Sequence, residues 1–216
     1  MCSQETYIKE RIKTQLKLAK KVEKVITPFL TSLANKYNGK LYGLDNKFKS
    51  EESALRKILS HIEDDTVINK KNSAYLDEKV EDLKDYLRYT IVLDEKNFTD
   101  NVSKILQELK DNDYKLMDLK NRFNEIYYKD ISSHYFDNKT IKIQFVFELQ
   151  FHTEESLKAK EISHLLYEIT REFQTDLDQI SENIMENIYK AIRKLYNEVP
   201  IPTDIDKIEE VNSKND

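Results

Sequence analysis

The first residues that could do chemistry are cations gathered around residue 50. Lys47 and Lys49 occupy alternate positions of a segment that we expect to be extended, so their side chains should point the same way. A helix is expected from Ser50 to His61. One face of it carries a hydroxyl and two further cations at helical spacing: Ser53, Arg56 and Lys57. Together these side chains could bind a triphosphate without a backbone loop, and the alternative is an exposed basic helix.

Two carboxylates lie in or beside segments that are predicted to be strands. In residues 141–151, every second residue is apolar and the residues between them are polar except Val146, which predicts a strand with one face in the core. Glu148, Gln150 and His152 should then project side by side from the opposite face. Asp85 directly precedes a second predicted strand, residues 86–93, which is rich in β-formers.

Asp85 and Glu148 together suggest metal-assisted chemistry. A carboxylate at the mouth of a strand could hold Mg²⁺, which takes one or two protein carboxylates and leaves its other positions to water and phosphate. Two carboxylates beside a cation clamp are the minimum equipment for phosphoryl or nucleotidyl transfer. Taken singly, Asp85 could equally belong to a turn or a helix end.

Composition excludes several other ways of binding a nucleotide. The chain has only two glycines, Gly39 and Gly43, which excludes every glycine-rich phosphate loop. Its single cysteine, Cys2, excludes an internal disulfide framework and any multi-cysteine metal site. Apolar runs fall far short of the roughly 20 residues of a membrane helix, and residues 1–30 lack the apolar region of a signal peptide. We therefore expect a cytoplasmic protein, or an effector acting in the cytosol of a target cell, with no membrane partner.

The charge distribution is uneven. The net charge of −5, from 35 basic and 40 acidic residues, does not favour nucleic-acid binding by the whole molecule. Locally, residues 9–24 are basic: Lys9, Arg11, Lys13, Lys17, Lys20, Lys21 and Lys24 stand against Glu10 and Glu23. This stretch could contact RNA or lipid headgroups, but a solvated helix face is the commoner meaning of such a pattern.

Periodicity predicts most of the remaining elements. Residues 4–26 form an amphipathic helix, Thr27-Pro28 ends it, and a second helical segment runs to Asn38-Gly39. Further helices are expected over 98–109 and 154–173, and a strand near 114–119. The final helix spans Asp176 to about Asn197, and the polar tail, Thr203–Asp216, is expected to be disordered.

The helix over 154–173 has two stripes at helical spacing. The first is apolar and is expected to face the core: Leu157, Ile162, Leu165, Ile169 and Phe173. The second alternates cationic and aromatic character: Lys160, His164, Tyr167 and Arg171.

Helices at both ends enclose the predicted strands, which indicates an α+β fold with a small mixed sheet. A length of 216 residues fits one domain overall. Within it we expect an N-terminal helical segment (1–40), a core (41–173), a C-terminal helix (174–200) and a polar, flexible tail (201–216).

Four motifs occur in an order that resembles the RelA/SpoT family, the synthetases of guanosine tetra- and pentaphosphate alarmones. They are K-x-K-S-x-x-S-x-x-R-K from residue 47, D-Y-L-R-Y-T-I-V from 85, K-N-R-F followed by Y-K-D-I, and F-E-L-Q-F-H-T-x-E-S from 147. The resemblance covers roughly residues 41–171 and is greatest to a divergent branch of phage, toxin and effector proteins. It implies a nucleotidyltransferase-like core with a sheet of about five strands.

The resemblance implies a reaction and a donor site. The β,γ-pyrophosphate of ATP would move onto a ribose 3′-hydroxyl, and AMP would leave. The family's ATP-binding residues correspond to Lys47, Lys49, Ser53 and Lys57, with Arg56 beside them. Asp85 corresponds to the Mg²⁺ ligand, and Glu148 to the glutamate proposed to assist the metal and activate the acceptor hydroxyl.

It also implies an acceptor site for a guanine or adenine nucleotide. Tyr128 corresponds to the tyrosine that stacks on the acceptor base. Four more residues would complete the nucleotide contacts: Gln150, His152, Lys160 and His164. His152 takes the place of an arginine in the family motif, so its role is also open to a structural interpretation at the strand end.

Several departures from the family surround the acceptor. Lys47 replaces an arginine, which keeps the charge but loses the bidentate fork. Asp130 stands where synthetases have a small residue or serine, and it adds a negative charge beside the acceptor site. Thr90 stands where synthetases place an arginine, and Arg88 lies two residues earlier.

Three functions therefore stay open at this stage. The first is an ATP-dependent pyrophosphokinase that acts on a nucleotide. The second is a toxin or effector that modifies the 3′ end of tRNA, and the third is a catalytically degenerate nucleotide-binding module. A homo-oligomer is compatible with the sequence, which leaves the oligomeric state undetermined.

Overall fold

A five-stranded mixed sheet forms the centre of the computed structural model, which describes residues 4–65, 72–137, 145–173 and 179–212. Its strands, in spatial order, are β1 (Lys40–Tyr42), β2 (Arg88–Val92), β5 (Phe145–His152), β4 (Ile131–Asp137) and β3 (Tyr114–Asn121). β2 and β5 run parallel, and the other neighbours are antiparallel. The predicted α+β fold with a small mixed sheet is confirmed.

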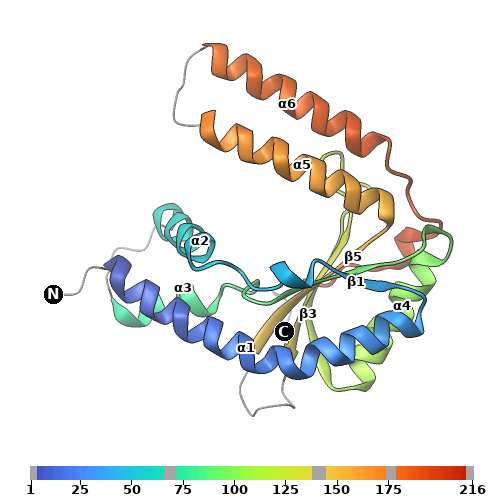
Figure 1. The fold of residues 1–216 in the computed structure, drawn as a ribbon, viewed down its shortest axis with the longest axis horizontal. Coiled ribbons are helices and arrows are strands. Elements are labelled where there is room, and N and C mark those ends of the chain that lie inside the picture. Colours follow the sequence, from blue (N-terminus) through green and yellow to red (C-terminus); the bar gives the residue numbers. More distant parts are fainter. Residues whose placement is uncertain (1–3, 66–71, 138–144, 174–178, 213–216) are drawn as a thin grey trace.

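Helices lie on both sides of this sheet (Figure 1). α1 (Gln4–Lys36) and α4 (Phe98–Asp111) pack on the apolar face, where Phe29 of α1 stacks on Tyr114 of β3 with ring centroids 5.1 Å apart. α2 (Glu51–Asp64) and α3 (Ser73–Glu81) pack against α1. α5 (Glu154–Phe173) and α6 (Gln179–Asn197) form a hairpin that projects from the other side. Within the described residues, none of these helices has the length and apolar character needed to cross a bilayer.

The predicted break at Thr27-Pro28 is wrong, because α1 is a single helix of 33 residues with Pro28 inside it. Thr27 does not cap a second helix, since its hydroxyl bonds the carboxylate of Glu23 and the hydroxyl of Tyr89. An interior proline removes one hydrogen bond and costs about 3 kcal/mol. The apolar face of α1 is buried from Ile8 to Ala34, on both sides of the proline, and this packing offsets the cost.

The alternation predicted for β5 is confirmed over its described residues. Phe145, Phe147, Leu149 and Phe151 are buried in the core, and Glu148 and Gln150 lie on the opposite face. Residues 141–144 of the prediction lie outside the described residues. β4 has no such sequence signal, because Ser133 and Asp137 interrupt the apolar residues on its buried face.

Residues 203–212 of the tail pack on the body of the protein, which corrects the prediction of disorder for this part of the tail. Ile205 and Ile208 are buried in the main core at 3% and 5% exposure. Val211 pairs with Leu119 of β3 through two backbone hydrogen bonds of 2.9 and 3.0 Å. Two apolar anchors and one bridge are thus enough to hold a segment whose overall composition is polar.

Replacing Ile205 with alanine should lower the free energy of unfolding by about 2–4 kcal/mol, because the change leaves a cavity in a packed core. Urea denaturation measures this loss. The matched control is Ile201→Ala, at a side chain that is 49% exposed and should change stability by no more than about 0.5 kcal/mol. Equal losses in the two variants would show that the tail does not contribute to the core.

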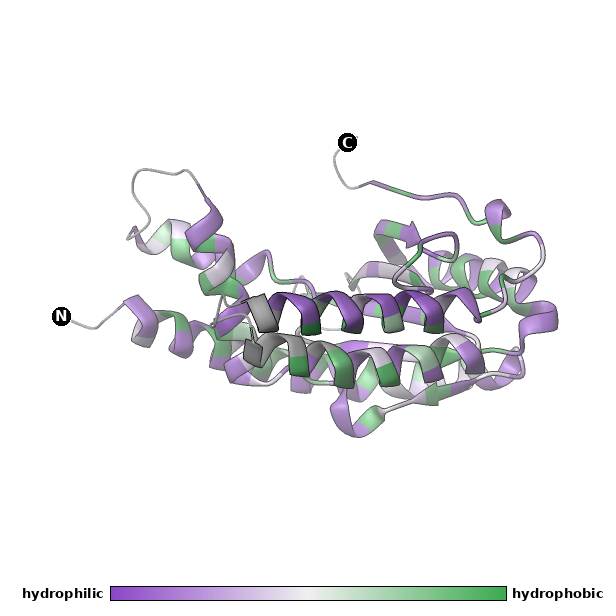
Figure 2. Ribbon diagram, turned by 90° about the horizontal axis from the view of Figure 1, so that it is seen from above, coloured by the Kyte–Doolittle hydropathy of each residue, from purple (hydrophilic) through white to green (hydrophobic). Residues whose placement is uncertain are grey.

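The apolar stripe predicted for α5 does not face the core. Leu157 is buried, but Ile162, Leu165 and Ile169 are 48%, 67% and 43% exposed. α5 packs chiefly on α6 through a small separate cluster built around Ala159, Ile192, Tyr196 and Val199. The two helices lie side by side and carry apolar and polar residues along their visible faces (Figure 2).

Candidate active site

A cavity of about 720 Å³ lies between α2 and α5, and its lining includes four lysine and arginine side chains. Its cationic and hydroxyl side chains come from the start of α2, from the segment before it and from β2: Lys49, Ser53, Arg56, Lys57 and Arg88. His61 and His164 lie on its wall, with Glu52 and Glu168 as the acidic members. We call this the cationic cavity. The helical spacing predicted for Ser53, Arg56 and Lys57 brings all three to it.

α2 begins at the cationic cavity because Ser50 caps it. The Ser50 side chain accepts a hydrogen bond of 3.1 Å from the backbone N–H of Ser53, and Glu51 and Glu52 occupy the first turn, where the helix dipole favours acidic residues. The opposite face of the helix buries Ala54 and Ile58 in the core. This anchoring leaves the cation-bearing face toward the cavity.

Asp85 is nearly buried and is held by two lysines of this cavity. Its Oδ2 accepts hydrogen bonds from Lys49 at 2.9 Å and Lys57 at 3.3 Å. Burial by itself raises the pKa of the Asp85 carboxyl, but the two lysines outweigh burial and the net pKa is lowered. The other oxygen, Oδ1, is buried without a hydrogen-bond partner. A buried carboxylate oxygen without a hydrogen-bond partner is well suited to coordinate a cation.

Glu148 lies on the neighbouring strand and is also mostly buried. Its Oε1 accepts hydrogen bonds from Gln150 at 2.7 Å and from the hydroxyl of Ser132 at 3.2 Å. Lys160 of α5 donates to the side-chain oxygen Oε1 of Gln150. The Gln150 side-chain amide is therefore oriented with its NH₂ group toward Glu148. These contacts fix the Glu148 carboxylate in place as an acceptor.

Glu148 lies on β5, and Asp85 lies three residues before β2, the strand that pairs with β5. Glu148 is paired with Arg88, three residues after Asp85, and its backbone N–H donates to the Leu87 carbonyl at 3.0 Å. Asp85 is bonded to two lysines that line the cationic cavity. Glu148 is bonded to Gln150, which lines a second cavity of about 480 Å³. Arg88 lines both cavities, so they adjoin at this residue.

We call the second cavity the polar cavity. Its polar lining includes Arg88 and Thr90 of β2, Gln150 of β5, and Lys160 and His164 of α5. Burial lowers the pKa of Lys160, and the nearby carboxylates of Asp130 and Glu148 oppose that change. Tyr128 and the sheet-edge residue Tyr42 also line this cavity.

Lys47 does not point the same way as Lys49. A 3₁₀ turn over Leu44–Asn46 precedes it, and its backbone is helical (φ −64°, ψ −25°) rather than extended. Its ammonium lies 3.4 Å from the carboxylate of Glu23 on α1 and donates to the Leu44 carbonyl. Lys47 is therefore not among the residues lining the cationic cavity, whereas Lys49 is.

The negative charge expected from Asp130 is neutralised. Asp130 is fully buried, and Arg122 binds it through two hydrogen bonds of 2.7 and 2.9 Å. Burial raises the pKa of Asp130, and the Arg122 guanidinium opposes that rise. The same guanidinium lies over the ring of Tyr128, 4.8 Å from its centroid. The Arg122–Asp130 pair thus supports Tyr128 from one side.

His152 is fully buried and does not line the cationic or the polar cavity. Its Nδ1 bonds the hydroxyl of Ser156 at 2.9 Å, and its ring lies against Tyr128 with centroids 6.2 Å apart. Burial lowers the pKa of His152 well below its usual value, and Lys160 and Arg122 lower it further. This placement corresponds to the structural interpretation of His152, at the junction of β5 and α5.

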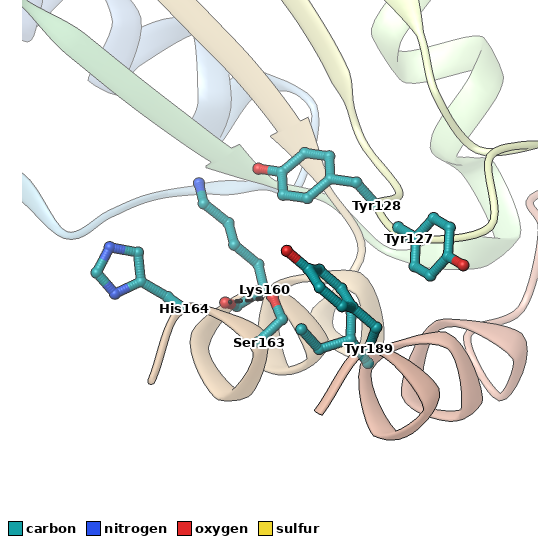
Figure 3. Close-up of a pocket in the computed structure, with 7 residues that line it drawn as sticks. Tyr127, Tyr128, Lys160, Ser163, His164 and Tyr189 are labelled. Atoms are coloured by element: carbon teal, nitrogen blue, oxygen red, sulfur yellow. Dashed lines mark hydrogen bonds between the residues drawn. The ribbon is translucent and has the colours of Figure 1, made fainter. Parts of the chain in front are cut away.

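Sequence reasoning did not assign Arg88, His61 or Tyr189 to the site. Arg88 could have been found, because it begins β2 and shares a strand face with Thr90. His61 lies in the last turn of α2, four residues after Lys57, and so falls on the helix face that carries the cations. Tyr189 has no sequence signal, since only the α5–α6 hairpin brings it beside Tyr128 (Figure 3).

Solved structures share this architecture, although no protein-family model and no curated protein matches the sequence. The small alarmone synthetase 1 from Bacillus subtilis bound to pppGpp superposes with a TM-score of 0.55 at 14% identity, over 83% of this chain and 89% of that one. The small alarmone synthetase 2 from the same organism superposes with a TM-score of 0.54 at 15% identity, over 86% of this chain and 94% of that one. The Type VI effector Tas1, in complex with its immunity protein, gives 0.52 at 19% identity, over 87% and 95%.

Proposed function

From the small alarmone synthetase fold of this chain, we propose that it is an ATP-dependent pyrophosphokinase. The 3′-oxygen of an acceptor nucleotide attacks the β-phosphorus of ATP, and the bond from that phosphorus to the bridging oxygen of AMP breaks. The β,γ-pyrophosphate moves to the acceptor, and the proton of the hydroxyl passes to a base. The observation that carries this proposal is the cationic cavity beside two carboxylates on adjacent segments.

The cationic cavity supports the donor end of the proposal. A triphosphate carries several negative charges, and the cavity presents Lys49, Arg56, Lys57 and Arg88 to it with Ser53 as a hydroxyl donor. Arg88 reaches the junction with the polar cavity, where the transferring phosphates would lie. Side chains thus supply the charge that glycine-rich loops supply in other nucleotide-binding proteins.

Glu148 is the proposed base. Its position beside the polar cavity, fixed by Ser132, Gln150 and Lys160, suits it to accept the proton of an acceptor hydroxyl. Tyr128, which lines the same cavity, offers a ring for the acceptor base. This arrangement leaves the acceptor hydroxyl between Glu148 and the donor phosphates.

Asp85 and Glu148 are the proposed Mg²⁺ ligands, and the orphaned Oδ1 of Asp85 fits that role. No cluster of three or more metal-ligating side chains occurs in the described residues, which agrees with an ion that takes most of its ligands from phosphate and water. When bound, Mg²⁺ would neutralise charge on the phosphates. Lys49 and Lys57 hold Asp85 ready in the protein alone.

The lysine-rich helix does not favour tRNA as the acceptor. Lys17, Lys20, Lys21 and Lys24 are exposed on α1. α1 packs on the apolar face of the sheet through Phe29 and Thr27, whereas the polar cavity lies on the other face. The lysines therefore do not line either cavity, and a nucleotide is the acceptor we propose.

Incubation with ATP labelled at the γ-phosphate, Mg²⁺ and separate acceptors tests the function. We expect label on a nucleotide 3′ position with one AMP formed per transfer, and no transfer when EDTA removes the metal. Label on tRNA alone would identify the toxin-type reaction instead. ATP binding without AMP formation for every acceptor would identify a catalytically degenerate module.

A further inference from the structure

A third cavity, of about 620 Å³, lies where the loop before β4 meets the α5–α6 hairpin. Aromatic and apolar side chains dominate its lining: Tyr127, Tyr128, Tyr189 and Ile192. We call it the tyrosine cavity. Figure 3 shows the rings of Tyr128 and Tyr189 on opposite sides of the opening, with Lys160 and His164 rising from α5 beside them. A volume of this size is typical of small-ligand sites.

The tyrosine cavity is continuous with the polar cavity. Tyr128, Lys160 and His164 line both of them. Lys160 is also bonded to Gln150, which is bonded to Glu148. A nucleotide with its ribose beside Glu148 would therefore have its base directed along Lys160 into the tyrosine cavity.

The Tyr128 ring is held by protein neighbours and also borders the tyrosine cavity. Arg122 covers one face at 4.8 Å from the ring centroid, and the buried Asp130 fixes Arg122 there. His152 and Tyr196 pack at an angle to the ring, with centroids 6.2 and 5.8 Å away. The part of the ring that lines the cavity lies across the opening from Tyr189 of α6. Tyr189 is 40% exposed, so its ring is accessible to a ligand in this cavity.

The polar groups of the tyrosine cavity are largely committed to protein partners. The Ser163 hydroxyl donates to the Lys160 carbonyl and shares a hydrogen bond of 2.9 Å with the Tyr196 hydroxyl. The Lys160 ammonium donates to Gln150. What remains among the described lining residues is tyrosine hydroxyls, which donate or accept equally, and the exposed ring of His164. The described lining residues therefore offer no fixed set of donors and acceptors that would distinguish one purine edge from another.

We propose that Tyr128 and Tyr189 form a two-sided stacking clamp for the acceptor base, which accepts adenine and guanine alike. The proposal rests on the proposed function for the position of the ribose. Stacking depends little on base identity, because every base has a π-face. Sites that read a base by hydrogen bonds discriminate by about 10⁴–10⁵-fold, whereas a stacking clamp should discriminate between the two purines by about tenfold or less.

The test compares kcat/KM for GDP and ADP as acceptors in the wild type, Tyr189→Ala and Tyr189→Phe. We expect the alanine variant to lose about 5- to 100-fold with both acceptors, mainly through KM, because one stacking contact is removed. Phenylalanine keeps the ring and should retain nearly full activity. The control is Leu165→Ala, which changes an α5 side chain that is 67% exposed and outside the cavity lining, and it should have no effect.

Calorimetry separates this proposal from the proposed function. GDP or ADP is titrated into protein saturated with α,β-methylene-ATP, which occupies the donor site and cannot transfer its pyrophosphate. Equal affinities for the two bases, both weakened by Tyr189→Ala, support the clamp even if no acceptor is turned over. A preference above about 1,000-fold for one base, or unchanged binding in Tyr189→Ala, overturns it.

Discussion

Glu148→Gln is expected to lower the rate of AMP formation from ATP by about 10²–10⁴-fold, the usual value of a positioned general base. Glutamine has nearly the same shape as glutamate and can still accept the hydrogen bond from Ser132. Its neutral amide cannot accept the proton of the acceptor hydroxyl, and it has no negative charge with which to bind a cation. Single-turnover assays with saturating ATP and acceptor measure the loss. The thermal midpoint should change by only a few degrees.

Glu155→Gln is the matched control for Glu148→Gln. It removes the same charge from an exposed glutamate in the first turn of α5, three residues after His152. Its rate should equal that of the wild type. Full turnover in Glu148→Gln would remove this residue from the chemistry, and equal losses in both variants would mean that the assay reports net charge alone.

Asp85→Asn should abolish transfer and also destabilise the protein without ligand by about 3 kcal/mol. The substitution leaves the Lys49 ammonium, which is only 9% exposed, without its carboxylate partner, and breaking a buried pair on one side typically costs about 3–5 kcal/mol. Urea denaturation at pH 7 measures this cost. The half-exposed Lys57 can rotate into water, so it should contribute little to the loss.

The double variant Asp85→Asn with Lys49→Met separates stability from chemistry. Removing both charges replaces the pair by neutral groups, so most of the lost stability should return. Pyrophosphate transfer should stay abolished, because the double variant lacks both the proposed metal ligand Asp85 and Lys49, a cation of the proposed ATP site. If the double variant were as unstable as Asp85→Asn, the buried lysine would not be the cause of the destabilisation.

The same pair predicts a pH dependence of stability. The pKa of Asp85 is lower in the folded protein than its unfolded value of 3.8. Its contribution to the free energy of unfolding is therefore fully present above pH 3.8 and is lost as the pH falls through the lower, folded pKa. The difference in free energy of unfolding between the wild type and Asp85→Asn should therefore become smaller below pH 3.8. A constant difference down to pH 2 would contradict this assignment.

Residue periodicity predicts those parts of the site that rest on regular elements. The alternation in β5 directs Glu148 and Gln150 away from the core, and helical spacing brings Ser53, Arg56 and Lys57 to one cavity, because in both elements one face is buried. The predicted direction of the Lys47 side chain is wrong, because a 3₁₀ turn of three residues changes the direction of the chain just before it. A turn of that length has no periodicity from which to read a direction.

Other differences arise from tertiary contacts that local patterns do not contain. Asp130 is read from sequence as a free charge, but Arg122, eight residues earlier, neutralises it. Pro28 stays inside a helix because one face of α1 is buried on both sides of the proline. The α5 stripe is apolar and yet exposed, since α5 finds its packing partner in α6 rather than in the sheet. In each case the contact that determines the outcome is made with a part of the chain that the local sequence pattern does not include.

A structure with Mn²⁺ and α,β-methylene-ATP would test most directly whether Asp85 and Glu148 act on one ion. Anomalous scattering locates the manganese independently of the phosphates. The result we predict is a single ion bonded to both carboxylates, with the triphosphate lying along Lys49, Arg56 and Lys57. An ion bound away from either carboxylate, or a triphosphate outside the cationic cavity, would contradict the proposed active site.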